Sequence, residues 1–267
     1  LNTYMVRNLK VMSFISGIVA LVLCAGFLFQ WDFVTNIWPW KIYYSQSQRL
    51  SEIFVASIFA AIAIPVLWIG IKGELAASLG GAINLGVMFA GMGVFCLQLY
   101  MANNSRQPVL LLGIFSLIMT VFFAFLSWQV RHLRYEDHRP TPKVVRFSFG
   151  FFAVALLFAG TALILKTANI FPWNLPEELR VIYGWVFLGA MCYFIYGVIV
   201  PKWGNAKGQL VGFLAYDVIL IVPFVQHFQT VIPEQQISLT IYVGVLVYSG
   251  ALAIYYLFIQ KDTRLLR

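Results

Sequence analysis

The sequence predicts an all-α integral membrane protein with eight transmembrane helices. We expect a tandem parallel 4+4 repeat whose pseudo-two-fold axis lies along the membrane normal. Three observations support this prediction. Of the 267 residues, 61% are hydrophobic and only 10% are charged, whereas soluble domains carry about 25% charged residues. Uncharged stretches repeatedly reach the length of a helical crossing, which takes about 20 residues. The second half of the chain also repeats the pattern of the first.

Hydropathy places the eight spans at residues 10–30, 51–71, 75–100, 108–130, 144–165, 181–200, 209–229 and 239–260. A helix satisfies its own backbone hydrogen bonds, which lipid cannot do. The apolar stretch of the first span is longer than a typical signal-peptide core and no small-residue cleavage site follows it, so we expect a retained helix. Pro65 and Pro223 lie inside spans, where we expect them to kink the helix.

The basic residues predict the orientation of the chain. An even number of crossings puts both ends of the chain on one side, together with Lys72 and the segments 131–143 and 202–207. That side carries 13 of the 18 Lys and Arg residues, and cytoplasmic loops are enriched in basic residues. We therefore expect a protein of the bacterial cytoplasmic (inner) membrane with both termini in the cytoplasm. The net charge of +8 reflects this asymmetry and contact with anionic headgroups of the lipid bilayer. Without a recognition motif, we expect no nucleic-acid partner.

An internal repeat is visible at an offset of 133 residues. Residues 11–40 match residues 144–173 at nine of 30 positions without a gap. The alignment places Asn-Ile-Trp-Pro-Trp on Asn-Ile-Phe-Pro-Trp, a shared loop motif that apolar composition does not explain. A two-residue deletion then brings Arg49 onto Arg180. We therefore divide the chain into a first four-helix repeat (1–130), a cytoplasmic linker (131–143) and a second four-helix repeat (144–267). Each repeat crosses an even number of times, so both enter the membrane in the same direction.

Each repeat carries an outer segment between its first two spans, at residues 31–50 and 167–180. Both segments place Trp and Pro where indole rings prefer the depth of the headgroups. The simpler explanation is an interfacial cap, and the alternative is a lid that faces a substrate. The interfacial repeat motif consists of Asn36, Trp38, Pro39, Trp40, Arg49, Asn169, Phe171, Pro172, Trp173 and Arg180.

The segment 33–40, followed nine residues later by Arg49 at the start of a helix, resembles part of a group of uncharacterised bacterial multipass membrane proteins. In that group a Trp-Pro-Trp element precedes a helix that begins with a similarly placed Arg. Residues 41–48 depart from the more proline- and threonine-rich version of the group. The resemblance implies no activity.

Asp217 is the only acid well inside a span, about eight residues from the cytoplasmic end of the seventh, or roughly 12 Å. Acids inside a membrane are expensive and mark functional sites by default; the alternative is a protonated or hydrogen-bonded residue within the bundle. With Asn84 and Tyr216 it forms a candidate intramembrane polar site. The repeat aligns Asp217 with a stripe of small residues suited to close helix packing. These are Ser78, Ala82, Gly86 and Ala90.

Motifs for chemistry are missing from the sequence. It has no Cys-x-x-Cys, no facing pair of intramembrane histidines and no lysine in a bundle core, so we expect no metal and no cofactor. Without paired acids or a nucleophile beside a base, we expect no enzyme.

Two functions remain open. The first is a non-catalytic accessory, assembly or scaffold subunit that contacts partner membrane subunits. The second is a transporter or channel for a small neutral or lipophilic solute. The scarcity of intramembrane charge favours the first, because little is left to select or couple ions. If transport is correct, the three residues of the candidate polar site should surround a hydrated cavity.

Overall fold

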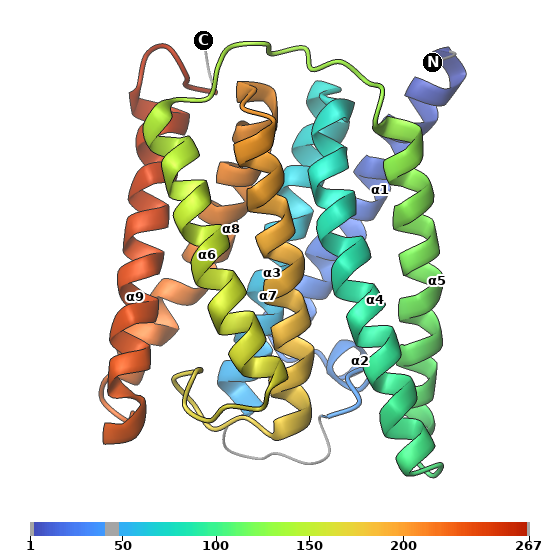
Figure 1. Cartoon of the computed structure of the whole chain (residues 1–267), viewed down its shortest axis with the longest axis vertical. Coiled ribbons are helices and arrows are strands. Elements are labelled where there is room, and N and C mark those ends of the chain that lie inside the picture. The colour runs from blue at the N-terminus through green and yellow to red at the C-terminus, as the bar shows by residue number, and fades with distance from the viewer. Residues whose placement is uncertain (1–2, 41–47, 266–267) are drawn as a thin grey trace.

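The computed structural model describes residues 3–40 and 48–265, and these residues form helices joined by short connections, with no β-strand. Eight helices are long and apolar enough to cross a membrane (Figure 1), which confirms the predicted all-α architecture and its eight crossings. They are α1 (Thr3–Leu28), α3 (Gln48–Lys72), α4 (Ser78–Ala102), α5 (Gln107–Val130), α6 (Lys143–Ile164), α7 (Glu177–Ile199), α8 (Trp203–His227) and α9 (Pro233–Ile254). Three short elements complete the fold: α2 (Asp32–Thr35), the 3-10 helix η2 (Leu75–Ala77) and the π-helical turn η3 (Tyr255–Ile259).

Several helices begin earlier than hydropathy predicts. The first residue is Glu177 rather than 181 in α7, Trp203 rather than 209 in α8, and Pro233 rather than 239 in α9. The added turns contain polar and small residues, which lower the mean hydropathy but continue the helix beyond the apolar part of the span. Helices α3 and α8 both continue through their internal prolines.

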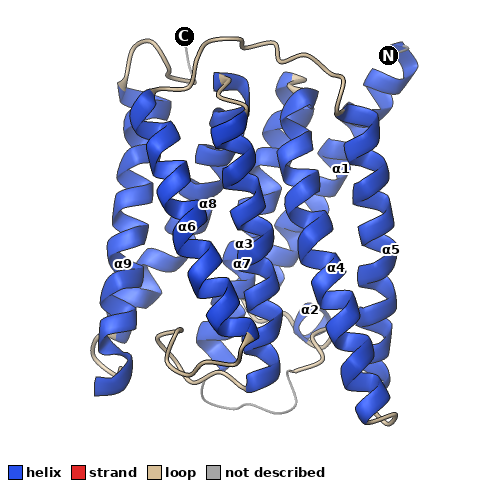
Figure 2. Ribbon diagram, in the orientation of Figure 1, coloured by secondary structure: helices blue, strands red, loops and turns tan. Residues whose placement is uncertain are grey.

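The crossing helices form two layers of four (Figure 2). One layer contains α5, α4, α7 and α6 in that order, and the other contains α1, α3, α8 and α9. Each layer takes two helices from each half of the chain. The contacts of α4 with α7 and of α3 with α8 therefore join the two halves.

Aromatic side chains fill the space between the layers in two clusters. In the first, the fully buried ring of Phe54 on α3 lies 4.7 Å from the ring of Tyr183 on α7. In the second, which we call the inner aromatic cluster, the rings of Phe194 on α7 and Phe213 on α8 stack with centroids 4.5 Å apart. The other members of the inner cluster are Phe149, Phe152 and Tyr248. Large buried rings of this kind contribute much of the packing energy of a core.

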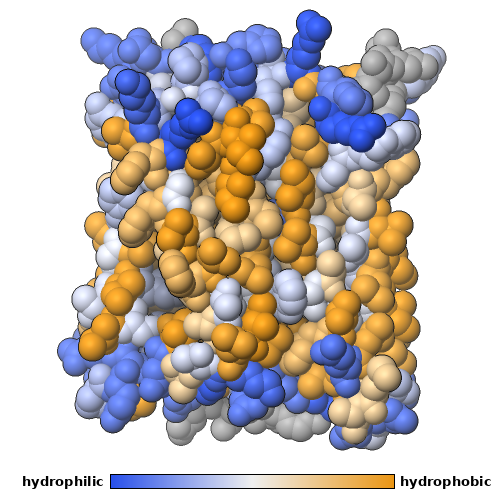
Figure 3. Space-filling model, in the orientation of Figure 1, coloured by the Kyte–Doolittle hydropathy of each residue, from blue (hydrophilic) through white to orange (hydrophobic). Residues whose placement is uncertain are grey.

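On the face shown in Figure 3, apolar residues cover the middle of the molecule, and hydrophilic residues lie at both ends. The start of α1, the end of η3 and the connection 131–142 lie at one end of the bundle, which we call the linker side. The opposite end, the Trp-Pro side, carries the connections 29–40 and 165–176. Among the described residues, the linker side has 12 Lys and Arg against four acids, and the Trp-Pro side has four against five. Lys41 and Arg267, which entered the predicted 13 to 5 split, lie outside the described residues.

The connection 131–142 is held across the linker side by hydrogen bonds. The backbone N–H of Trp203 donates to the carbonyl of Arg139 at 2.7 Å. The carboxylate of Asp137 accepts from the Arg139 guanidinium at 2.6 Å and from Lys207 Nζ at 2.8 Å. These bonds, led by the one from Arg139, hold the pKa of Asp137 well below its usual range, although partial burial opposes them.

Candidate functional site

Asp217 lies near the middle of α8, with its side chain only 4% exposed and directed toward α9. Ser249 Oγ lies 2.8 Å from Asp217 Oδ2 and also 2.8 Å from the carbonyl oxygen of Val245. The other carboxyl oxygen, Oδ1, is buried and has no hydrogen-bond partner. Because α8 begins at Trp203, Asp217 lies 14 residues from its linker-side end, or about 21 Å. The predicted depth of about 12 Å was therefore too small.

Tyr216 and Tyr242 stand next to this carboxyl group. Their hydroxyl groups form a hydrogen bond between α8 and α9, and both interact electrostatically with Asp217. The ring of Tyr216 also contacts Phe54 of α3, at a centroid distance of 6.2 Å. Tyr216 and Asp217 thus form one polar group at the α8–α9 contact.

Asn84 lies elsewhere, at the contact between α4 and α7. A Cβ atom built on Gly189 of α7 would lie 2.6 Å from the backbone oxygen of Asn84 and 2.7 Å from its Oδ1. The structure assigns no hydrogen bond between Asn84 and either Tyr216 or Asp217. Only two of the three predicted site residues are therefore brought together.

The predicted small-residue stripe is not where α4 approaches its neighbours most closely. Among Ser78, Ala82, Gly86 and Ala90, only Ala82 is fully buried, and a Cβ on Gly86 would meet only Phe123 Cβ at 3.7 Å. The tight contacts fall at other glycines, Gly80, Gly91 and Gly93. Helix α4 packs against α5 on one face and α7 on another, so a single stripe does not describe its packing.

Trp40 and Trp173, the aligned tryptophans of the interfacial repeat motif, are buried inside the protein. Trp40 is 2% exposed and its Nε1 donates to Glu178 Oε2 at 2.7 Å. Glu178 also accepts two hydrogen bonds from Arg106, at 2.6 and 2.8 Å. Trp173 is 4% exposed and its Nε1 donates to Ser51 Oγ at 2.9 Å. A buried indole needs a partner for its N–H, and here each finds that partner on the second crossing of the other half.

Other residues of the interfacial repeat motif surround these two tryptophans. Trp38 packs with its ring centroid 5.2 Å from that of Trp40, and Phe171 packs 4.7 Å from Trp173. Arg180 donates to the carbonyls of Leu175 and Lys166, whereas Arg49, its partner in the alignment, is exposed. Asn36 is exposed and Pro39 is half-buried. In the second half, Asn169 adopts a φ of 58°. The carbonyl oxygen of Pro172 lies 2.7 Å from a ring nitrogen of His227, with which it forms a hydrogen bond.

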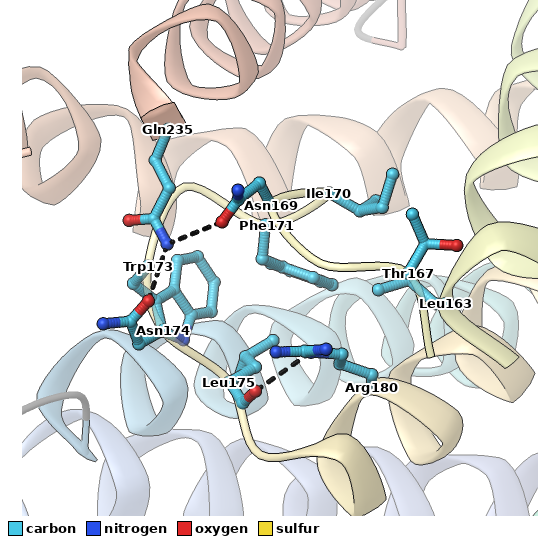
Figure 4. Close-up of a pocket in the computed structure, with 10 residues that line it drawn as sticks. All are labelled: Leu163, Thr167, Asn169, Ile170, Phe171, Trp173, Asn174, Leu175, Arg180 and Gln235. Atoms are coloured by element: carbon cyan, nitrogen blue, oxygen red, sulfur yellow. Dashed lines mark hydrogen bonds between the residues drawn. The ribbon is translucent and has the colours of Figure 1, made fainter. Parts of the chain in front are cut away.

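A pocket that the sequence did not predict lies on the Trp-Pro side, between the connection 165–176 and the start of α9 (Figure 4). Gln235 Nε2 donates to Asn174 Oδ1 at 2.9 Å across it. Its volume suits about one water molecule. In the sequence, the feature that could have indicated this pocket was Gln235, a polar residue in the first turn of α9. The lining residues are Leu163, Thr167, Asn169, Ile170, Phe171, Trp173, Asn174, Leu175, Arg180 and Gln235.

Residues 3–40 and 48–265 contain no group of three or more His, Cys, Asp or Glu residues that could hold a metal ion. Cys24, Cys96 and Cys192 are free thiols. No family model, curated protein or solved structure matches the chain.

Proposed function

We propose that this multipass membrane protein is a non-catalytic accessory, assembly or scaffold subunit of a complex in the bacterial cytoplasmic membrane. This function is supported by the way the intramembrane polar groups contact one another within the chain. Asp217 bonds to Ser249, Tyr216 bonds to Tyr242, and Asn84 lies apart at the α4–α7 contact. These groups connect helices of this chain at two separate contacts, α8–α9 and α4–α7.

The edge of the bundle formed by α1 and α5 is the surface on which we expect partner helices. Within this chain, α1 packs mainly against α3 and α5 mainly against α4. Both expose large apolar side chains, including Ile15 at 56%, Ile118 at 61% and Val121 at 70%. Apolar surface of this extent contacts lipid, partner helices or both.

Photo-crosslinking in native membranes tests the accessory role. A photoreactive residue in place of Val121 on α5 should give a protein adduct of discrete mass, identified by mass spectrometry. The matched control is Phe158 on α6, which is 71% exposed at the opposite edge. If the chain purifies without a partner in mild detergent and the probe at Val121 gives no protein adduct, a partner on this edge is ruled out.

The alternative function is a transporter or channel for a small neutral or lipophilic solute. One observation favours it, the partnerless Oδ1 of Asp217, because a free buried acceptor suits a bound water or solute. Solute uptake into reconstituted vesicles would support it if Asp217→Asn abolished uptake without unfolding the protein.

We also propose that the two halves are tandem repeats and that the linker side is cytoplasmic. Exchange of α1, α3, α4 and α5 for α6, α7, α8 and α9 turns each main helix contact into another main contact. For example, α4–α7 becomes α8–α3. The reciprocal tryptophan contacts follow the same exchange, and the excess of basic residues supports the orientation. Membership of the resembling bacterial group stays a prediction.

A further inference from the structure

Helix α9 carries a row of polar residues on one face. Gln235, Ser238, Tyr242 and Ser249 follow one another at intervals of three, four and seven, which places them on the same side of a helix. Each contacts a polar group of the bundle interior. Ser238 Oγ donates to the carbonyl of Ile170 at 2.5 Å, and the contacts of the other three are those described above. The row therefore runs from the pocket on the Trp-Pro side to Asp217.

The route from Asp217 toward the linker side is different. One turn earlier on α8, Phe213 stacks on Phe194 and lies 4.8 Å, between centroids, from Phe152. These rings belong to the inner aromatic cluster and offer no hydrogen-bonding atoms. Polar groups thus lead to Asp217 along α9 from the Trp-Pro side. Toward the linker side, the ring of Phe213 lies on α8 between Asp217 and the next buried polar residue, Gln209.

The surroundings of Asp217 favour a neutral carboxylic acid. The titratable groups that face it are Tyr216 on its own helix and Tyr242 on α9. Among the described residues, α3, α7 and α9 present no charged side chain to it. A carboxylate without a cation at this depth is unfavourable. In the structure Ser249 Oγ lies within hydrogen-bond distance of both Asp217 Oδ2 and the carbonyl of Val245. Because a serine hydroxyl has a single proton, a neutral Asp217 would donate to Ser249 Oγ, and Ser249 would donate to Val245.

We propose that Asp217 is a proton-binding site that exchanges its proton with the Trp-Pro side along the polar row of α9. When the Oδ2–H bond breaks, the proton passes to water by way of the hydroxyl groups of Tyr242 and Ser238. A carboxylate remains, which Ser249 stabilises by turning its proton toward it. The site goes beyond the accessory role and does not depend on it.

Carbodiimide labelling of the full chain tests the proposal, because dicyclohexylcarbodiimide reacts with protonated buried carboxyl groups. The acid O–H adds across a C=N bond and the product rearranges to a stable N-acylurea, with nothing oxidised or reduced. The protein is reconstituted in one orientation in vesicles whose inner and outer pH are set separately. The adduct on Asp217 is then measured by mass spectrometry.

Raising the pH on the Trp-Pro side should lower the rate of labelling several-fold, and raising it on the linker side should leave the rate unchanged. Asp217→Asn should remove the adduct. Labelling that ignores the pH on both sides, or that follows the linker side, would overturn the proposal.

Two variants on the row test the route. Tyr242→Phe and Ser238→Ala should each slow the response of labelling to a pH jump on the Trp-Pro side. Tyr248→Phe is the matched control on the same helix. The hydroxyl group of Tyr248 bonds to Ser148 in the linker-side half of the bundle, away from the proposed route. Thermal melting shows which variants fold. An unchanged response in a folded row variant, or equal slowing in the control, would refute the route.

Discussion

The contact between α4 and α7 should be highly sensitive to Gly189→Ala. The added Cβ would lie 2.6 Å from the backbone oxygen of Asn84 and 3.1 Å from Met88 Cβ. A backbone atom cannot move aside without shifting α4. Overpacking typically costs about 1–3 kcal/mol, and a clash with a backbone atom belongs in the upper part of that range. The better helix propensity of Ala returns at most about 1 kcal/mol. We therefore expect a net loss of about 1–2 kcal/mol.

Gly86→Ala is the matched control on α4. Its Cβ would meet only Phe123 Cβ at an ordinary 3.7 Å, so its effect should lie between zero and a gain of about 1 kcal/mol. Both variants are compared with the native chain by equilibrium unfolding in mixed detergent micelles, followed by tryptophan fluorescence. Equal effects of the two substitutions, or full stability of Gly189→Ala, would show that α4 and α7 do not meet as described.

Three further predictions follow from the two ends of the bundle. Glu178→Gln should lower thermal stability by about 1 kcal/mol, because it removes the charge from a partly exposed ion pair; an unchanged melting temperature would contradict this. The hydrogen bonds from Arg139 lower the pKa of Asp137 in the folded protein. The charged carboxylate of Asp137 therefore stabilises the fold above its unfolded pKa of about 4, and this stabilisation is lost as the pH falls. Asp137→Asn should therefore weaken acid destabilisation, and an unaltered stability profile between pH 5 and pH 2 would refute this, since that range spans the unfolded value. A cysteine at Asn103 should react with an impermeant maleimide in intact cells and one at His138 only after lysis, so the reverse pattern would overturn the orientation.

The crossings were predictable because each depends on the summed hydropathy of consecutive residues. A stretch of about 20 apolar residues favours the bilayer whatever its neighbours are, so eight helices and the placement of both chain ends on one side followed from hydropathy alone. Helix ends were less accurate at α8 and α9, where polar residues continue the helix outside the apolar stretch.

The candidate site was only partly predictable. Asp217 stood out because it is an acid among apolar residues, and its place beside Tyr216 follows from their adjacency. Its bond to Ser249, 32 positions away, and the separate location of Asn84 depend on how helices pair. The Trp-Pro motif was likewise visible as a repeat, but the bonds of Trp40 and Trp173 to Glu178 and Ser51 of the other half depend on how the halves pack.

By itself, the sequence determined the membrane class, the number of crossings and the unequal charge of the two sides, because each arises from transfer free energies and charges that add along the chain. Only the tertiary structure decided that each of the two layers takes two helices from each half, that Trp40 and Trp173 are buried and bond to the opposite half, and that polar residues of α9 lead to Asp217. These features depend on contacts between residues far apart in the chain. In lipid, apolar faces gain little from burial against one another, so shape and hydrogen bonding select the partners.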